Sequence, residues 1–158
     1  MKKFFKYILY TTIIIIVLIA VHFKLRSQKT VYAVTSKNNS TSDTQLLARA
    51  INGEARGESY EGQVAVGAVI LNRVKSSKFP NSIAAVIYQP GAFTAVSDGQ
   101  INTPIDNNST VVKAAKDALN GWDPTGGAIY YFNPDTATNS WIWSGPQTIT
   151  IGKHIFCK

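Results

Sequence analysis

The chain has 158 residues, of which 45% are hydrophobic and 16% are charged, and its formal net charge is +7. This length suits one globular domain with a core of its own, preceded by a short extra segment. Six of the 16 Lys and Arg residues come before Val34, where no acid occurs, which leaves ten against nine Asp and Glu. The rest of the chain is therefore almost neutral, which argues against a nucleic-acid-binding protein.

Residues 1–33 are typical of an export leader. A basic start, Met1 to Lys6, precedes a continuously apolar or uncharged run from Tyr7 to Val21. This pattern predicts either a signal peptide, for which Val31-Tyr32-Ala33 offers a small-residue cleavage site, or a retained signal anchor. In both cases we expect an exported protein that is secreted or membrane-anchored and faces outward.

A polar linker and a first helix are expected next. Residues 34–43 are polar and turn-prone, which predicts a linker, and the folded domain is expected to occupy residues 44–158. Ser42 or Asp43 can cap a helix that begins there. The apolar side chains that recur at helical spacing in this segment are Leu46, Leu47, Ala50 and Ile51.

A carboxylate follows this helix and precedes a second one. Gly53 is a typical helix stop, so Glu54 is expected in the glycine-bounded connection Gly53 to Glu58. The helix that starts at Glu61 is apolar on nearly every side and is therefore expected to be buried. An acid held against such a helix loses solvation, and desolvation favours the protonated form that a general acid needs. Glu54 is thus the candidate catalytic residue.

The remainder predicts two short helices and a β-rich end. Helices are expected over Ser82 to Tyr88 and Ser109 to Asn120, with a loop from Pro90 to Asn108 between them. The expected strands are Ala128 to Phe132, Trp141 to Trp143, and Thr148 to Phe156, the last interrupted by a hairpin turn at Gly152-Lys153. Helices first and a small antiparallel sheet last predict the α+β fold class.

Aromatic and polar side chains in the second half suit a carbohydrate groove. Aromatic ring faces can cover the apolar side of a pyranose, while Asn and Thr can bind hydroxyl or acetamido groups. The candidate substrate-binding residues are Phe93, Thr94, Tyr131, Asn133, Trp141, Trp143 and His154. Each has a structural alternative: the aromatics can fill the core of a small sheet, Asn133 can serve a turn, and His154 can be a structural residue of its strand.

Several other polar residues allow two interpretations. Arg56 is a candidate supporting residue that can pair with a neighbouring carboxylate or orient the loop. Glu58 is a second candidate supporting residue, although its position also suits the positive N-terminus of the next helix. Asp98 and Asp123 lie beside glycine or proline and are interpreted first as turn acids. The single Cys157 excludes an internal disulfide.

Four long motifs resemble the catalytic domain of the SleB-type spore cortex-lytic enzymes. They are GEARGESYEGQVAVGAVILNRV, FPNSIAAVIYQPGAFTAVSDGQI, NGWDPTGGAIYYFNPDTATNSWIW and IGKHIFCK, and the resemblance extends from about Thr44 to Lys158. It implies a small lysozyme-like α+β domain that cuts the glycan strands of peptidoglycan with one essential glutamate. That glutamate is the first in a (G/A)-E-(A/S)-R-G-E motif, which is Glu54 in this chain.

The number of well-placed carboxylates bears on the mechanism. Most glycosidases use two, whereas only Glu54 has a strong claim here. One is enough if the substrate supplies its own nucleophile. The resemblance supports a lytic transglycosylase that cuts between N-acetylmuramic acid and N-acetylglucosamine and leaves a 1,6-anhydromuramic end, on spore cortex during germination. This reaction needs no cofactor and no metal. The expected partners are peptidoglycan glycan strands and, if the leader is uncleaved, a membrane; a regulatory protein is left open.

Other activities remain as alternatives. A hydrolase of the cell wall would use Asp98, Glu58 or another acid to position water. A non-catalytic, membrane-tethered glycan-binding module would need the aromatic residues and not Glu54. A peptidase built on Cys157 and His154 is disfavoured, because residues three apart on one strand point to opposite faces.

Overall fold

The computed structural model describes the backbone of residues 2–158 and the side chains of residues 14–29 and 41–158. The chain divides into two compact units, Met1–Ser40 and Thr41–Lys158. Helix α1, Lys2–Ala55, contributes to both units. The boundaries of the leader, the linker and the domain given above remain predictions.

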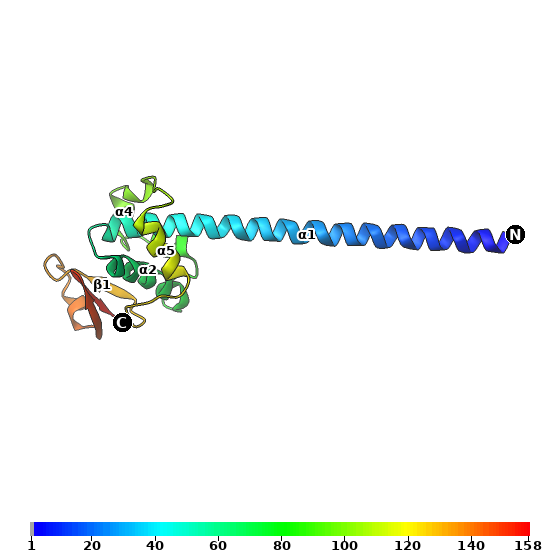
Figure 1. Ribbon diagram of the computed structural model, residues 1–158. Coiled ribbons are helices and arrows are strands. Elements are labelled where there is room, and N and C mark those ends of the chain that lie inside the picture. The colour runs from blue at the N-terminus through cyan, green and yellow to red at the C-terminus, as the bar shows by residue number, and fades with distance from the viewer. Residues whose placement is uncertain (1) are drawn as a thin grey trace. The chain divides into compact units, whose positions relative to one another are not determined.

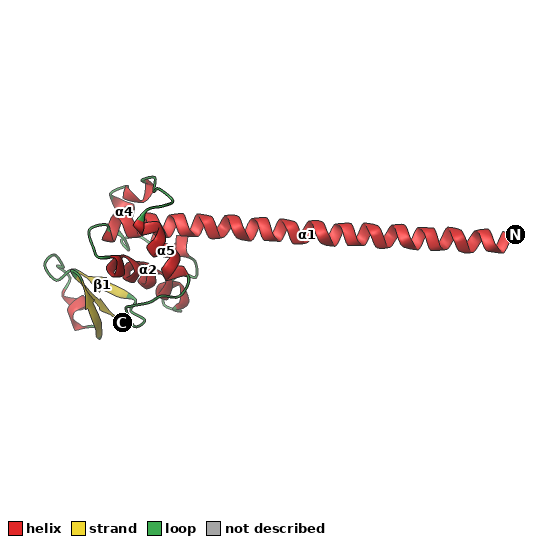
Figure 2. Cartoon of the chain, in the orientation of Figure 1, coloured by secondary structure: helices red, strands yellow, loops and turns green. Residues whose placement is uncertain are grey.

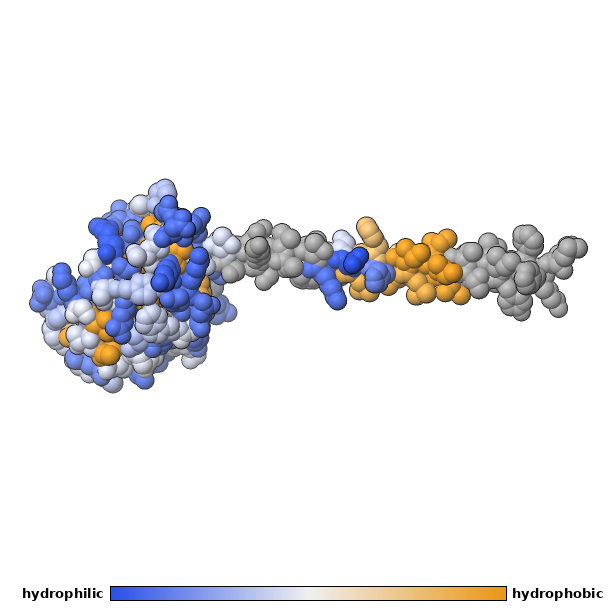
Figure 3. Space-filling model, viewed as in Figure 1, coloured by the Kyte–Doolittle hydropathy of each residue, from blue (hydrophilic) through white to orange (hydrophobic). Residues whose placement is uncertain are grey.

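In the first unit, all described side chains, residues 14–29, are exposed. Most of those from Ile14 to Leu25 are apolar, and they form the orange part of this unit in Figure 3. Within the described part of the chain, no helix contains a stretch that is both long and apolar enough to cross a bilayer. Residues 1–13 and 30–33 of the predicted leader, with the cleavage site Val31-Tyr32-Ala33, and residues 34–40 of the predicted linker lie outside the described side chains.

The second unit holds the remaining helices and a single sheet. The helices are α2 (Tyr60–Lys75), α3 (Ile83–Ile87), α4 (Thr94–Ser97) and α5 (Thr110–Leu119), with 3-10 turns η1 (Gln100–Asn102) and η2 (Ser140–Ser144). The strands β1 (Tyr130–Phe132), β2 (Gln147–Ile151) and β3 (His154–Cys157) form an antiparallel sheet in the order β1-β3-β2. The colours of Figure 1 show that α2 to α5 precede the strands in the chain, and Figure 2 shows the strands grouped together. The α+β prediction is confirmed.

Helix α2 lies at the centre of the core. Val66 and Ile70 pack in one cluster with α1 and α5, where Ile51 is fully buried. Ala65 and Val69 pack in a second cluster with Phe156 and other residues of the sheet region. Because both faces of α2 are covered by apolar partners, the prediction of a buried helix is confirmed. The same helix therefore sets the spacing between the helical part and the sheet.

Serine caps begin three of the helices. Ser82 and Ser109 accept hydrogen bonds from the backbone N–H groups of Ala85 and Val112, as expected for N-caps. Ser59 caps α2 in the same way, so this helix begins at Tyr60, one residue before the predicted start. Capping thus explains why these segments start where they do.

The predicted ends of the first helix are wrong. Neither Ser42 nor Asp43 is an N-cap, because α1 already includes the preceding residues and leaves no free N–H groups there. Gly53 does not end the helix, which continues through Glu54 to Ala55. Glycine is compatible with helical backbone angles, so a glycine alone does not stop a helix whose last turn is held by tertiary contacts.

Two downstream predictions need correction. Trp141 to Trp143 form part of the 3-10 turn η2 and are no part of the sheet, although Ile142 is buried and both tryptophans are exposed as in a strand. A short apolar run has no periodicity that separates strand from helix. The segment from Pro90 to Asn108, predicted as loop, contains α4 and η1. The hairpin turn at Gly152-Lys153 is confirmed, with Gly152 at φ +58°.

We expect Gly67→Val to destabilise the domain by about 1–3 kcal/mol, because added methyl groups overpack a filled core. A Cβ at Gly67 would lie 3.0 Å from Ile51 Cδ1 and 3.2 Å from Ala118 Cβ. Urea unfolding of the full chain measures the change. Gly57→Val is the control, since a Cβ at Gly57 meets no atom within 4 Å. Equal stability of the two variants would contradict this account of the packing.

Candidate active site

The Glu54 carboxylate is held from two sides. Its Oε1 accepts hydrogen bonds from the Thr94 hydroxyl and the Ala95 N–H, both at 2.9 Å. Its Oε2 accepts a hydrogen bond from the Tyr131 hydroxyl at 3.1 Å. The two oxygens therefore have donors from segments 40 and 77 residues away in the chain. The side chain is half-buried, in the last turn of α1.

The contact with α4 depends on local geometry. Phe93, the N-cap of α4, makes no side-chain cap bond, so the first N–H groups of this short helix need another acceptor. The carboxylate of Glu54 fills that role for Ala95, and an anion at a helix N-terminus is stabilised. Gly53 permits the close approach, because a Cβ at this position would lie 2.4 Å from Ala95 Cβ.

Tyr131, on strand β1, donates to the other oxygen of the carboxylate. We call the three donors Thr94, Ala95 and Tyr131 the Glu54 clamp. Its ring packs against His154 at 5.0 Å and Phe156 at 5.9 Å between centroids. Burial raises the pKa of Tyr131 well above its usual value, and the charge of Glu54 adds to this, whereas Arg73 acts in the opposite direction. The phenol thus keeps its proton at all physiological pH values and stays available as a donor to Glu54.

A cleft of about 530 Å³ lies beside this clamp. Thr94 and Tyr131, which both bind Glu54, are also part of its wall. Other wall residues include Arg73, Phe79, Tyr130, Asn139, Trp141 and Ile142. Trp141 is 57% exposed and meets Tyr130 edge-on at 5.3 Å. The wall of the cleft therefore combines aromatic rings with two of the donors to the Glu54 carboxylate.

The structure brings together three of the predicted substrate-binding residues. Thr94, Tyr131 and Trp141 line the cleft. Phe93 is buried beneath it, at 4% exposure, where it packs against Arg73. His154 is buried behind Tyr131. Their roles in binding remain predictions, but the first three have surfaces that a ligand in the cleft can reach.

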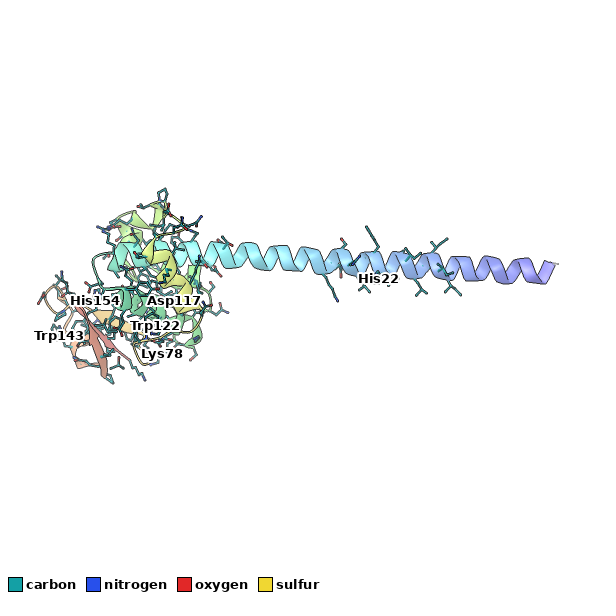
Figure 4. All side chains as sticks on the ribbon, viewed as in Figure 1. His22, Lys78, Asp117, Trp122, Trp143 and His154 are labelled. Atoms are coloured by element: carbon teal, nitrogen blue, oxygen red, sulfur yellow. The ribbon has the colours of Figure 1, made fainter. Side chains whose placement is uncertain are left out.

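The other two predicted binding residues are not part of the cleft wall. Asn133 Oδ1 accepts a hydrogen bond from the Asp135 N–H, at 2.9 Å, in a turn that follows β1. This is the structural alternative expected for an asparagine before proline. Trp143 stacks edge-on against Phe132 at 4.8 Å and is 44% exposed, at the sheet end of the domain (Figure 4).

Glu58 ties the loop after α1 to the hairpin turn. Its Oε2 accepts a hydrogen bond from the Lys153 N–H at 3.1 Å. A Cβ at Gly152 would displace this same oxygen, and the φ of +58° at Gly152 would strain any residue with a side chain. Glu58 therefore holds the hairpin and does not face the cleft wall. Arg56 donates a hydrogen bond to the Gln100 side chain, which joins the same loop to η1.

The two acids interpreted as turn residues, Asp98 and Asp123, accept hydrogen bonds from backbone N–H groups of turns. Asp98 accepts hydrogen bonds from the backbone and side chain of Gln100. Asp123 accepts from the N–H groups of Thr125 and Gly127 and from the Asn72 side chain. Burial opposes ionisation of Asp123, but these hydrogen bonds outweigh it and lower its pKa.

Cys157 and His154 belong to different surroundings. Cys157 packs in a cluster with Phe132 and Ile142, and burial raises the pKa of its thiol. His154 faces Tyr131 and Phe156 instead. The expectation that these side chains point to opposite faces of their strand agrees with this packing. Within the described residues, no group of three or more His, Cys, Asp or Glu side chains could hold a metal ion.

Sequence reasoning missed one charged residue of the site. Arg73, near the end of the buried helix α2, is only 8% exposed and lies within 5.7 Å of three aromatic ring centroids. In the sequence, Arg73 and Lys75 are typical of the basic residues that end a helix, so no signal marked Arg73 as buried. Two of its three aromatic partners come from distant segments and could not be identified there.

Comparison with known proteins gives consistent matches. A protein-family model described as Cell Wall Hydrolase matches residues 57–157, beginning just past Glu54. The spore cortex-lytic enzyme of Bacillus cereus is 65% identical over 120 residues, which are 75% of this chain and 45% of that protein. The spore cortex-lytic enzyme of Bacillus subtilis is 58% identical over 135 residues, 85% of this chain and 44% of that protein. The chain thus spans less than half the length of these relatives.

Two solved structures are also similar. The catalytic domain of the Bacillus cereus SleB protein superposes with a TM-score of 0.71 at 64% identity, covering 75% of this chain and 91% of that one. The catalytic domain of the germination-specific lytic transglycosylase SleB from Bacillus anthracis gives a TM-score of 0.69 at 65% identity, covering 73% and 93%.

We expect the stability of the domain to fall as the pH drops below about 6.5, because of His154. Burial lowers the pKa of His154 from 6.5, while the charges of Glu58 and Glu54 favour the protonated form and Lys153 opposes it. The unfolded chain thus takes up a proton at a higher pH than the folded chain. Stability is full above pH 6.5 and declines below it, by at most about 1.4 kcal/mol per pH unit.

Thermal unfolding between pH 5 and 7.5 measures this slope. We expect His154→Gln to lose most of it, whereas His22→Gln, the variant of the only other histidine in the chain, should keep it. A slope that is the same in both variants would show that another group is responsible.

Proposed function

This chain belongs to the Cell Wall Hydrolase family, and we propose that it is an enzyme that cleaves the glycan strands of peptidoglycan. The observation that carries the proposal is the Glu54 carboxylate, fixed by three hydrogen bonds next to an aromatic-lined cleft. Relatives with 58–65% identity are named spore cortex-lytic enzymes, which supports spore cortex peptidoglycan as the substrate.

The cleft suits a sugar chain. Its wall combines exposed Trp141 and the ring of Tyr130 with the polar side chains of Thr94 and Asn139. Aromatic rings cover the apolar face of a pyranose, and hydroxyl and amide groups bind its polar substituents. Glycan bound there would pass Thr94 and Tyr131, the donors that hold Glu54, which supports a role for this acid in the proposed cleavage.

We propose lytic transglycosylase chemistry, which needs one carboxylate. Glu54 protonates the oxygen between N-acetylmuramic acid and N-acetylglucosamine, and the bond to C1 of the muramic ring breaks. Glu54 then takes the proton of the muramic C6 hydroxyl as that oxygen bonds to C1. A 1,6-anhydromuramic end results, and no water is consumed. Attack within one sugar gains from proximity, so no second protein group is required.

The surroundings of Glu54 support this dual role. The hydroxyls of Thr94 and Tyr131 can either donate or accept a hydrogen bond, so they can serve the carboxyl group with or without its proton. Among the described residues, the wall of the cleft includes no aspartate or glutamate. Asp98 and Glu58, the acids considered for a hydrolase, bind backbone N–H groups elsewhere. The transglycosylase name of one similar structure agrees with the proposal.

Peptidoglycan lies outside the cytoplasmic membrane, so the proposed activity requires export. The basic and apolar start of the chain, residues 1–33, is suited to this as a signal peptide or anchor. We therefore propose that the domain acts in the cell envelope or spore, facing outward.

We expect Glu54→Gln to reduce the release of muropeptides from purified spore cortex peptidoglycan by about 10²–10⁴-fold, the usual contribution of a general acid or base. Mass spectrometry of the products of the full chain should show 1,6-anhydromuramic ends. Glu61→Gln is the matched control, since Glu61 is exposed in the first turn of α2 and should leave the activity unchanged.

Each other result has a distinct meaning. Reducing ends in place of anhydro ends would indicate that water is the nucleophile and would reject the transglycosylase step. Undiminished release by Glu54→Gln would reject Glu54 as the catalytic group. Glycan binding without any release by the wild-type chain would favour a binding module.

We expect Gly53→Ala to lower the rate by about 100-fold while Gly57→Ala leaves it unchanged. The new methyl group at Gly53 would collide with Ala95, which must move away from the carboxylate it binds. A misplacement of about 1 Å at a catalytic group can cost 10²-fold. The rate of muropeptide release by folded variants tests this. A fully active Gly53→Ala variant would show that the close contact is unnecessary.

A further inference from the structure

Arg73 is a buried cation enclosed by aromatic rings. Its Cζ lies 5.3 Å from the ring centroid of Phe79, 5.1 Å from that of Phe93 and 5.7 Å from that of Tyr130. Its Nε donates a hydrogen bond to the Ile129 carbonyl oxygen at 2.7 Å. Cation–π contacts of this kind gain strength when the cation is desolvated.

Burial of the Arg73 guanidinium costs free energy, which indicates that its charge has a role. Burial lowers the pKa of Arg73, and the groups that favour its charge are Tyr131, Tyr130 and Glu54. A guanidinium stays protonated in proteins, so the domain keeps a positive charge in its interior. Burying such a charge costs free energy that its contacts must offset. An apolar side chain of similar length would fill the same space without this cost.

The contacts of Arg73 connect the two halves of the Glu54 clamp. On one side it meets Phe93, which directly precedes the Thr94 and Ala95 donors. On the other it binds Ile129 and Tyr130, which directly precede the Tyr131 donor. The side chain comes from α2, the helix that lies between the helical part and the sheet.

We propose that Arg73 is a positioning residue, which holds residues 93–95 and 129–131 at the separation that the Glu54 carboxylate spans. This inference rests on the proposed function, because it assigns Arg73 a part in the same reaction. The cation acts through the two donor segments and through its field, and it needs no direct contact with the sugar. Arg73 also touches the wall of the cleft, so binding of substrate is the competing role that the experiment must separate.

Two variants and one control separate these roles. Arg73→Met keeps a flexible apolar stem and removes the charge and the Nε donor. Arg73→Lys keeps the positive charge but loses the planar guanidinium that packs on the rings and the Nε donor to Ile129. Arg49→Met is the control, because the Nε of Arg49 also bonds a backbone carbonyl, that of Gln45, within its own helix.

The first measurement is the kinetics of glycan cleavage by the full chain. We expect Arg73→Met to lower kcat by about 100-fold with KM changed by less than about twofold. Arg73→Lys should recover part of kcat, because its charge remains, whereas a purely space-filling role would be served better by methionine. Arg49→Met should match the wild type. A raised KM with unchanged kcat would instead show that Arg73 binds substrate and would overturn the proposal, as would wild-type kinetics of Arg73→Met.

The second measurement does not depend on activity. Hydrogen exchange of the Ala95 amide reports the bond to Glu54, and we expect it to accelerate at least tenfold in Arg73→Met and less in Arg73→Lys. Unchanged protection in both would reject the positioning role. If Arg73→Met does not fold, the proposal is tested by comparing Arg73→Lys with Arg49→Met. Exchange and kcat equal to those of the wild type in Arg73→Lys would then count against it. An inactive wild-type chain would reject the proposed function alone.

Discussion

The carboxylate of Glu54 joins two parts of the domain that the chain order keeps far apart. One oxygen is bound at the start of α4 and the other by Tyr131 on β1. The distance between these donors is set by what lies beneath them, which is the buried helix α2 with a helical cluster on one face and the sheet on the other. The packing of the core therefore determines the geometry of the site, because a shift of α2 would change both.

Polar groups are concentrated around this carboxylate at a cost to stability. Tyr131, Arg73 and His154 all lie in surroundings that disfavour their charged forms. Such groups are tolerated where neighbouring charges and hydrogen bonds offset desolvation. Buried groups with shifted pKa values gather at functional sites more often than elsewhere. Their clustering next to the cleft is consistent with a site at which a proton moves.

The other acids considered for catalysis have structural roles. Asp98 and Asp123 bind turns, and Glu58 fastens the hairpin that carries His154 at its end. These contacts separate the acids that hold turns from Glu54, whose donors Thr94 and Tyr131 line the cleft, a distinction that the sequence alone left open. The sequence placed Glu58 and Asp98 among the alternatives for a second acid because it shows residue types and spacing, and it does not show which backbone N–H groups each acid meets.

The sequence by itself determined the local features of this protein: the buried helix, the two short helices near Ser82 and Ser109, the Gly152-Lys153 turn and the identity of Glu54 as the candidate acid. These depend on side-chain periodicity and on contacts a few residues apart. Only the tertiary structure decided what surrounds Glu54, the role of Arg73 and the helical form of the segment from Trp141 to Trp143. Those features depend on contacts between separate segments, from Phe132 with Trp143 to Glu54 with Tyr131, whose geometry is fixed only when the core packs.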